Sequence, residues 1–178
     1  AEMIARNEEC ELVALVDVKG KESLGIDQFS VPLFSSLDDL LNSPLDIDVI
    51  NVASPNGFHA KQGMSILESG RHLVIEKPMS LTKTDSEQLI FKGLQKHKQV
   101  FCVMQNRYSP PSVWLKELLE QGKLGKVFMV QINCYWNRDN RYYKPESKKK
   151  KGDLDGGTLF TQFSHFIDLM YWYFGDIK

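Results

Sequence analysis

The chain has few cysteines, no long apolar run and no surplus of charge, and each absence excludes a class of protein. Its three cysteines, Cys10, Cys102 and Cys134, lie far apart and form no CxxC pair, so we expect a reducing cytoplasm and no metal site. No apolar run approaches the roughly 18 residues that span a membrane. The net charge of −1 gives no reason to expect nucleic acid, and the basic run 148–151 is interpreted as a solvated loop.

A glycine-rich turn is also lacking near the start of the chain. Dinucleotide-binding domains open with a strand and such a turn, and an acidic residue follows about twenty residues later. Asp17 has the position of that acid, because it ends the apolar run 12–16. Residues 1–6 have the pattern of the first helix, with no glycine loop ahead of them. We therefore expect the first strand and its glycine loop to be missing from this sequence.

What is present is an alternation of short apolar runs with helical stretches. The pattern predicts helices, capped by Ser36 and by Thr82 or Thr84, alternating with buried strands. The strands are expected at residues 12–16, 48–53, 72–75 and 100–104, and the helices at 36–41, 59–69 and 80–96. This order indicates an α/β fold, a Rossmann-type parallel sheet with helical crossovers, over residues 1–108.

Beyond residue 108 the pattern changes to that of a second domain. After Pro110-Pro111 we predict a helix at 112–121, a strand at 126–136, a loop at 137–153 and a helix at 158–174. One strand and one helix cannot close a sheet. Residues 109–178 are therefore predicted to be an incomplete α+β domain for substrate binding and dimerisation.

The tripeptide Glu76-Lys77-Pro78 directly follows an apolar strand. Open α/β sheets bind ligands at the carboxyl ends of their strands, and a lysine held there suits proton transfer. Ser54-Pro55-Asn56 follows the preceding strand in the same way, with His59 in the next helix. The alternatives are ordinary ones: a surface lysine, an asparagine helix cap and a helix histidine with no catalytic task.

Three polar residues share one face of the last predicted helix. Thr161, His165 and Asp168 are spaced i, i+4 and i+7 among apolar neighbours. A polar stripe on an apolar helix faces solvent or lines a polar site. His165 is thus a candidate for the active site, and the alternative is a core histidine with satisfied hydrogen bonds.

Four segments in this order resemble the Gfo/Idh/MocA family of sugar and sugar-nucleotide dehydrogenases. They are residues 12–17, 53–60, 76–78 and 155–168. Within that family, Gln105-Asn106-Arg107 and the segment 156–162 are most similar to the enzymes that oxidise UDP-N-acetylglucosamine or its uronate at C3, in surface-polysaccharide (lipopolysaccharide) synthesis. The resemblance implies an NAD-dependent oxidoreductase and a homo-oligomer, a dimer or tetramer, formed through the second-domain sheet.

The resemblance also implies the site residues. Lys77 and His165 would be catalytic. The family's usual aspartate is Thr161 here, so the proton is expected to pass to Lys77 with His165 assisting or orienting, although the sequence does not decide which of the two takes it. Substrate contacts would come from Lys77, Arg107, Thr161, Gln162 and His165. Cofactor contacts would come from Asp17, Ser54, Pro55, Asn56, His59, Glu76, Lys77 and Asn106.

The cofactor is expected to be NAD, with NADP less favoured. The Asp17 carboxylate can accept hydrogen bonds from both ribose hydroxyls and repels a 2′-phosphate, a repulsion that Lys19 partly offsets. Two other functions stay open. One is a free-sugar or inositol dehydrogenase of the same family, and the other is a dinucleotide-binding regulator without catalysis.

Overall fold

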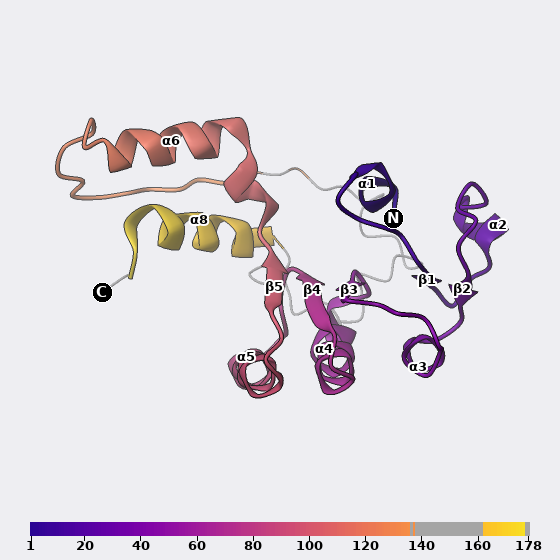
Figure 1. Ribbon diagram of the computed structural model, residues 1–178. Coiled ribbons are helices and arrows are strands. Elements are labelled where there is room, and N and C mark those ends of the chain that lie inside the picture. Colours follow the sequence, from indigo (N-terminus) through magenta and orange to yellow (C-terminus); the bar gives the residue numbers. More distant parts are fainter. Residues whose placement is uncertain (136, 138–161, 177–178) are drawn as a thin grey trace.

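The structure is a computed structural model and describes residues 1–135, 137 and 162–176. Short helices and strands alternate over the first hundred residues, and helices follow them (Figure 1). In chain order the elements are α1 (Glu2–Arg6), β1 (Leu15–Val16), α2 (Lys21–Leu24), β2 (Leu33–Phe34), α3 (Leu37–Leu41), β3 (Val49–Val52), η1 (Asn56–Phe58), α4 (His59–Glu68), β4 (His72–Glu76), α5 (Lys83–Lys96), β5 (Val100–Val103), η2 (Gln105–Tyr108), α6 (Pro110–Glu120) and α8 (Ser164–Phe174).

The strands confirm the predicted α/β class, because every described pair is parallel. β3, β4 and β5 form one sheet in that order, with α4 and α5 as the crossovers, and β1 pairs with β2 in a second sheet. The break between β1 and β3 lies where a Rossmann sheet of strand order 3-2-1-4-5-6 has its first strand.

The region between Asp17 and Ser36 holds two elements that sequence analysis did not predict. α2 and β2 have four and two residues, too few for any periodicity to show. The loop between them is fixed instead by Lys21, whose ammonium donates to the carbonyl oxygens of Phe29 and Val31 at 2.6 and 2.7 Å. No hydrophobic pattern in the sequence signals such a contact.

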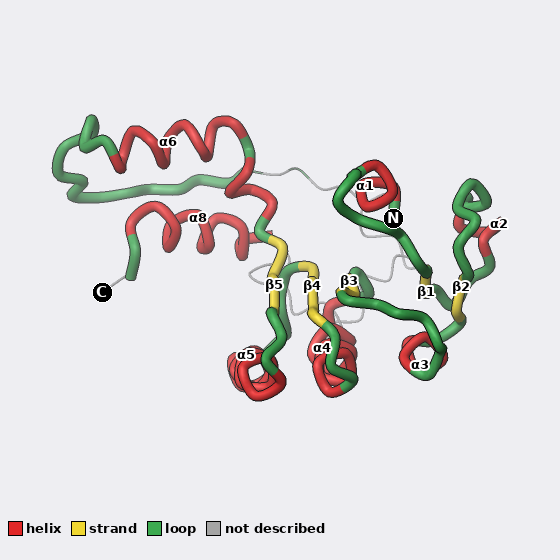
Figure 2. The backbone as a smooth tube through the Cα atoms, in the orientation of Figure 1, coloured by secondary structure: helices red, strands yellow, loops and turns green. Residues whose placement is uncertain are grey.

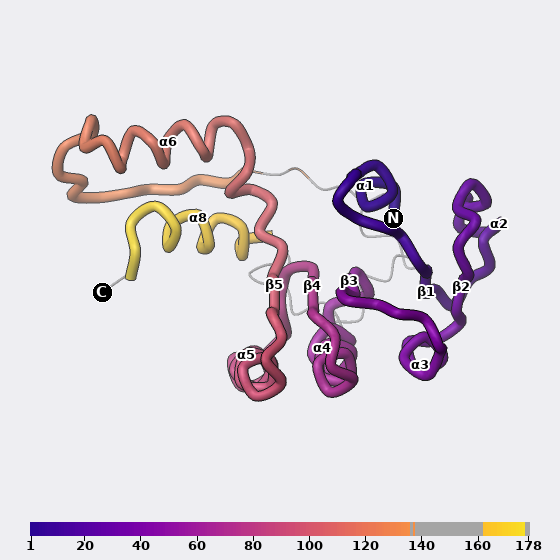
Figure 3. Tube along the Cα trace, in the orientation of Figure 1, coloured from indigo at the N-terminus to yellow at the C-terminus, as the bar shows by residue number. Residues whose placement is uncertain are grey.

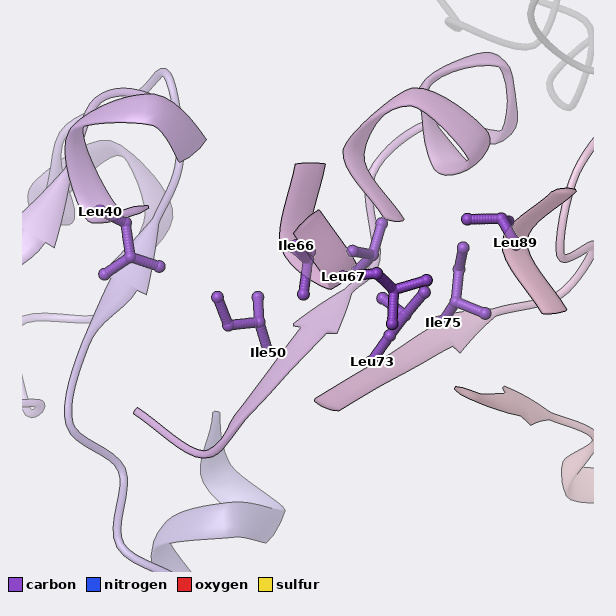
Figure 4. Packing of buried hydrophobic residues seen from close by; sticks show 8 residues of the cluster. Leu40, Ile50, Ile66, Leu67, Leu73, Ile75 and Leu89 are labelled. Carbon is purple, nitrogen blue, oxygen red and sulfur yellow. The ribbon is translucent and has the colours of Figure 1, made fainter. Parts of the chain in front are cut away.

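The core lies between α4 and the larger sheet. Figure 4 shows Ile66 and Leu67 of α4 directed at the strand residues Ile50, Leu73 and Ile75. Gly63 allows this close approach, since a Cβ atom there would lie 2.9 Å from a methyl carbon of Leu73 and of Leu89. Because α4 follows β3 and the short η1, it begins at the carboxyl ends of the strands.

Two predicted caps are confirmed. The Ser36 hydroxyl accepts from the backbone N–H of Asp39 at the start of α3. Of the two threonines considered for α5, Thr82 is the cap and accepts from the N–H of Asp85 at 3.1 Å. α5 therefore begins at Lys83 rather than near residue 80, where the buried Ser80 hydroxyl instead donates to the Thr82 carbonyl.

The second region departs from prediction in two places. Residues 126–135 form no strand, and Figure 2 draws them as loop, because a strand needs a hydrogen-bonded neighbour and no described residue pairs with them. Pro110 and Pro111 do not precede the helix but begin α6, where a missing N–H costs nothing. The predicted loop 137–153 and the start of the last helix lie outside the described residues, apart from residue 137.

α6 and α8 lie side by side although their sequences are far apart, as the colours of Figure 3 show. The Lys116 ammonium donates to the Trp172 carbonyl at 2.8 Å, and the Tyr173 hydroxyl donates to the Ser112 carbonyl at 3.2 Å. These bonds fix α8 against the chain that follows β5. Among the described residues, no helix is both long and apolar enough to cross a bilayer.

Candidate active site

The predicted site segments meet at one edge of the larger sheet. Ser54 follows β3, Lys77 follows β4 and Asn106 follows β5. The strands are in register there, because Val52 pairs with Ile75 and Glu76 pairs with Val103. Parallel strands place their carboxyl ends together, which is the usual ligand-binding edge of such sheets.

The segment after β3 is held by its own side chains. The Ser54 hydroxyl donates to the Gln62 amide oxygen at 2.6 Å. Pro55 is the N-cap of η1 and Asn56 its first residue, so Asn56 is not the cap of α4. His59 is buried, with one ring nitrogen 2.8 Å from the Ser54 carbonyl oxygen and the other 2.7 Å from that of Pro78. Both nitrogens face the protein's backbone, so neither is available for the cofactor contact predicted for His59.

Lys77 begins the bend that follows β4. Its backbone N–H donates to the Glu76 carboxylate at 3.3 Å, and its peptide bond to the buried Pro78 is cis. No residue of the sequence marked that peptide as cis beyond the proline itself. The bend takes the chain away from the sheet edge at the point where the Lys77 side chain begins.

His165 of α8 is the second titratable group at this edge. Burial lowers the pKa of its imidazole, and the positive charge of Lys77 lowers it further, against the opposing charges of Asp168 and Glu76. Lys77 and His165 therefore lie within range of each other's charge, although 87 residues separate them in the sequence. Nδ1 of His165 is buried and has no hydrogen-bond partner in the part of the chain that the structure describes.

An ion pair between Arg107 and Asp168 joins η2 to α8. Nε of Arg107 donates to Oδ2 of Asp168 at 2.7 Å, and Nη2 donates to Oδ1 at 2.5 Å. The guanidinium also lies 5.8 Å from the ring centroid of Trp172. The predicted substrate contact of Arg107 has to use its remaining donors. Sequence analysis missed the pair because no spacing rule connects residues 61 positions apart.

Cys102 of β5 lies within the field of the same charges. Burial, followed by the negative charges of Asp168 and Glu76, raises the pKa of its thiol to about 11. It is therefore a protonated thiol at neutral pH and supplies no thiolate nucleophile. Among the described residues, no cluster of histidine, cysteine and carboxylate side chains could hold a metal ion.

The remaining predicted residues have mixed outcomes. Asp17 directly follows β1, and its Oδ1 accepts from the N–H of Lys19 at 2.9 Å, which orients the carboxylate. Asn106 lies half-buried in η2, and Gln162 lies half-buried just ahead of α8. Thr161 lies outside the described residues.

The chemistry of these residues fits NAD. The Asp17 carboxylate could accept from the adenosine ribose, and the segment 54–56 lies at the start of η1 beside the sheet edge. Lys77 and His165 would lie on the side of the nicotinamide. The buried Nδ1 of His165, which has no partner among the described residues, favours a bound ligand there, because buried polar atoms are otherwise hydrogen-bonded.

A parallel sheet with titratable groups at its carboxyl edge is typical of dinucleotide-binding oxidoreductases. Residues 1–104 match the oxidoreductase family with an NAD-binding Rossmann fold, Gfo/Idh/MocA, and residues 113–178 match the Gfo/Idh/MocA C-terminal domain. The chain belongs to this family. The resemblance inferred from four sequence segments is thereby confirmed.

Solved structures and a curated relative give the likeness in more detail. The WlbA dehydrogenase from Bordetella pertussis, in complex with NADH and UDP-GlcNAcA, is 31% identical with a TM-score of 0.90, over 99% of this chain and 51% of that one. WlbA from Chromobacterium violaceum, with the same ligands, is 28% identical with a TM-score of 0.87, over 95% and 49%. The scyllo-inositol 2-dehydrogenase (NADP+) IolW of Bacillus subtilis is 29% identical over 80% of this chain and 38% of its own. The chain thus spans about half or less of the length of these relatives.

Proposed function

We propose that the protein is an NAD-dependent dehydrogenase that oxidises a sugar hydroxyl, at C3 of a UDP-N-acetylated sugar or its uronate. The observation that carries this proposal is that the charge of Lys77 acts on His165. Two segments remote in sequence bring these groups to one sheet edge, and the buried Nδ1 of His165 has no partner among the described residues. A hydroxyl that must lose its proton requires such groups within hydrogen-bond reach.

The roles of the two residues follow from their electrostatics. The pKa of His165 is lowered, so its ring is neutral at neutral pH and can accept the hydroxyl proton. The positive charge of Lys77 stabilises the oxygen that loses that proton. The sequence favoured Lys77 as the proton acceptor but left the choice between the two residues open; the lowered pKa favours His165. NAD, when bound, accepts the hydride from the carbon that carries the hydroxyl.

The choice of substrate rests on the relatives. Both WlbA structures contain UDP-GlcNAcA, and the likeness to the Bordetella protein covers nearly the whole chain. A free inositol is the second candidate, because IolW acts on scyllo-inositol and is similarly identical. A regulator without catalysis is disfavoured, since it would have no use for the Lys77–His165 pair.

We propose that the protein acts in the cytoplasm as a homo-oligomer in surface-polysaccharide synthesis. The sequential apolar residues Val127, Phe128, Met129 and Val130 are all exposed, with Phe128 at 85% and Met129 at 83%. An apolar run of this kind is typical of a surface that another subunit covers. Light scattering of the full-length protein tests this, and a monomer at micromolar concentration would contradict it.

The test of the catalytic proposal is a substrate panel. Full-length protein is incubated with NAD and UDP-GlcNAcA, UDP-GlcNAc, free glucose or scyllo-inositol, and NADH absorbance is followed. We expect turnover with UDP-GlcNAcA. Preference for scyllo-inositol would favour the second candidate, and NAD binding without turnover on any member would favour the regulator.

A further inference from the structure

His59 makes a contact at each end of its ring that sequence analysis did not foresee. Its side chain is 1% exposed, so no water competes for either nitrogen. Nδ1 lies 2.7 Å from the carbonyl oxygen of Pro78, and Nε2 lies 2.8 Å from that of Ser54. We call these two contacts the His59 bridge.

Both partners of the bridge are acceptors. A carbonyl oxygen has no hydrogen to give, so each contact is a hydrogen bond only if the ring nitrogen donates. A neutral imidazole has one N–H, and its bare nitrogen would then face a carbonyl oxygen at hydrogen-bond distance. Both distances lie within the roughly 2.7–3.2 Å range of N–H···O hydrogen bonds. Whichever ring nitrogen carries the hydrogen, the ring donates to one of the two carbonyl oxygens and fills the space between them.

The two carbonyls belong to the two segments of the proposed site. Ser54 begins the segment after β3, and Pro78 is bonded directly to Lys77. Apart from the sheet, the bridge is a direct link between these two loops. Resting on the proposed function, we infer that His59 is a positioning residue: its ring spans the carbonyl oxygens of Ser54 and Pro78 and holds Lys77 in register with the segment 54–56.

This role differs from that of an ordinary buried histidine. Loss of a core side chain lowers stability wherever it lies, but loss of the bridge also releases the peptide next to Lys77. A displacement of about 1 Å at a reacting group can cost about 100-fold in rate. The bridge therefore predicts an effect on kcat of the folded enzyme, separate from any effect on unfolding.

His72 offers a matched control. It lies at the end of β4 that is opposite Lys77. Its Nδ1 accepts from the backbone N–H of Gln99 at 3.0 Å, so replacing His72 also removes one histidine hydrogen bond. In the full-length enzyme we expect His59→Leu to lower kcat about 10- to 100-fold with little change in the KM for the sugar. His59→Gln, which keeps one N–H donor, should recover part of kcat, and His72→Gln should leave kcat within about twofold. Equal kcat for wild type, His59→Leu and His59→Gln would overturn the inference.

A readout without turnover separates this inference from the proposed function. 15N spectra of histidine-labelled full-length protein, assigned through His59→Gln, should show a slowly exchanging N–H on the His59 ring, because that hydrogen is buried and hydrogen-bonded. Rapid exchange of this N–H with solvent overturns the bridge, even if the enzyme is active. Wild-type protein that oxidises no sugar but shows the slowly exchanging N–H overturns the proposed function and leaves the bridge standing.

Discussion

The two buried histidines at the sheet edge differ in their surroundings. His59 begins α4, in the well-packed first region, and both of its ring nitrogens lie against backbone carbonyls. His165 is on α8, and its buried Nδ1 has no partner among the described residues. Both ring nitrogens of His59 contact the protein, whereas Nδ1 of His165 is open to a hydrogen bond as far as the described residues show.

The comparison shows how the hydrogen bonds of a buried side chain distinguish a positioning role from ligand binding. Buried nitrogen atoms are almost always hydrogen-bonded, so a satisfied ring indicates a positioning role and an unsatisfied one indicates an expected ligand. From the sequence, His165 was predicted to be catalytic and His59 to contact the cofactor, with an ordinary buried histidine as the alternative for each. The contacts add that the His59 ring lies between two backbone carbonyls, whereas Nδ1 of His165 has no partner among the described residues.

Loss of Lys77 is expected to have the largest effect. Lys77→Ala should lower kcat about 10²- to 10⁴-fold, because the residue that stabilises the reacting oxygen is gone, while the Kd for NAD changes little. Steady-state kinetics and calorimetric NAD titration measure the two quantities. Unchanged turnover would mean that Lys77 takes no part in the reaction and that His165 is an ordinary buried residue.

The next largest effect is expected from loss of the ion pair that attaches α8 to η2. Arg107→Ala leaves the Asp168 carboxylate, 12% exposed, without its partner, and should lower the free energy of unfolding by about 1–3 kcal/mol. Lys83→Ala removes an exposed ion pair with Glu87 and should cost only about 0–1 kcal/mol. Urea denaturation of both variants checks the contrast. Equal losses would mean that the Arg107–Asp168 pair contributes no more than a surface pair.

Asp17 should control the cofactor at the other end of the site. Asp17→Ala is expected to weaken NAD binding about tenfold and to improve NADP binding relative to NAD, because ribose hydrogen bonds are lost together with the repulsion of a 2′-phosphate. Titration of NAD and of NADP into the wild-type protein and the variant measures these affinities. Lys19→Ala is the control and should strengthen the preference for NAD. Unaltered affinities would place the ribose elsewhere.

The smallest expected effect is a shift in pH dependence. His165 must be neutral to accept a proton and its pKa is lowered, so kcat/KM should fall on the acid side with a midpoint below 6.5. The stability contribution of the neutral ring is likewise present above 6.5 and lost as pH falls from there through the lowered pKa. Asp168→Asn removes a charge that raises this pKa, so the midpoint should move lower still. A midpoint that rises would contradict the assignment.

The parts of the fold that could be predicted from sequence are those with a repeating pattern. β3, β4, α4 and α5 were expected within a few residues, because apolar runs and helical periodicity identify them. The expected strand at 126–136 is not formed by the described residues, since alternation shows which face a strand would bury but not whether a neighbour exists to pair with it. α2 and β2 were too short to give any pattern.

The site was predictable by type but not by contact. The position of Lys77 after a strand indicated a ligand-binding edge, and the polar stripe that includes His165 and Asp168 indicated a polar site. That the two belong to one site was implied by the family resemblance. The partners could not be foreseen, because Arg107 and Asp168, or His59 and Pro78, meet only through the three-dimensional path of the chain. Spacing rules connect residues within one helical turn or one pair of strands, whereas these contacts join residues that are farther apart in the sequence.

The central claim is that Lys77 and His165 act on one hydroxyl. The most direct measurement compares kcat for Lys77→Ala, His165→Asn and the double variant of the full-length enzyme, on the sugar that the panel identifies. When two residues act as a unit, replacing the second after the first lowers kcat little further. The kcat of the double variant should therefore fall no more than about tenfold below that of the slower single variant. If the two losses multiply in full, Lys77 and His165 act independently, and the account of a shared hydroxyl is wrong.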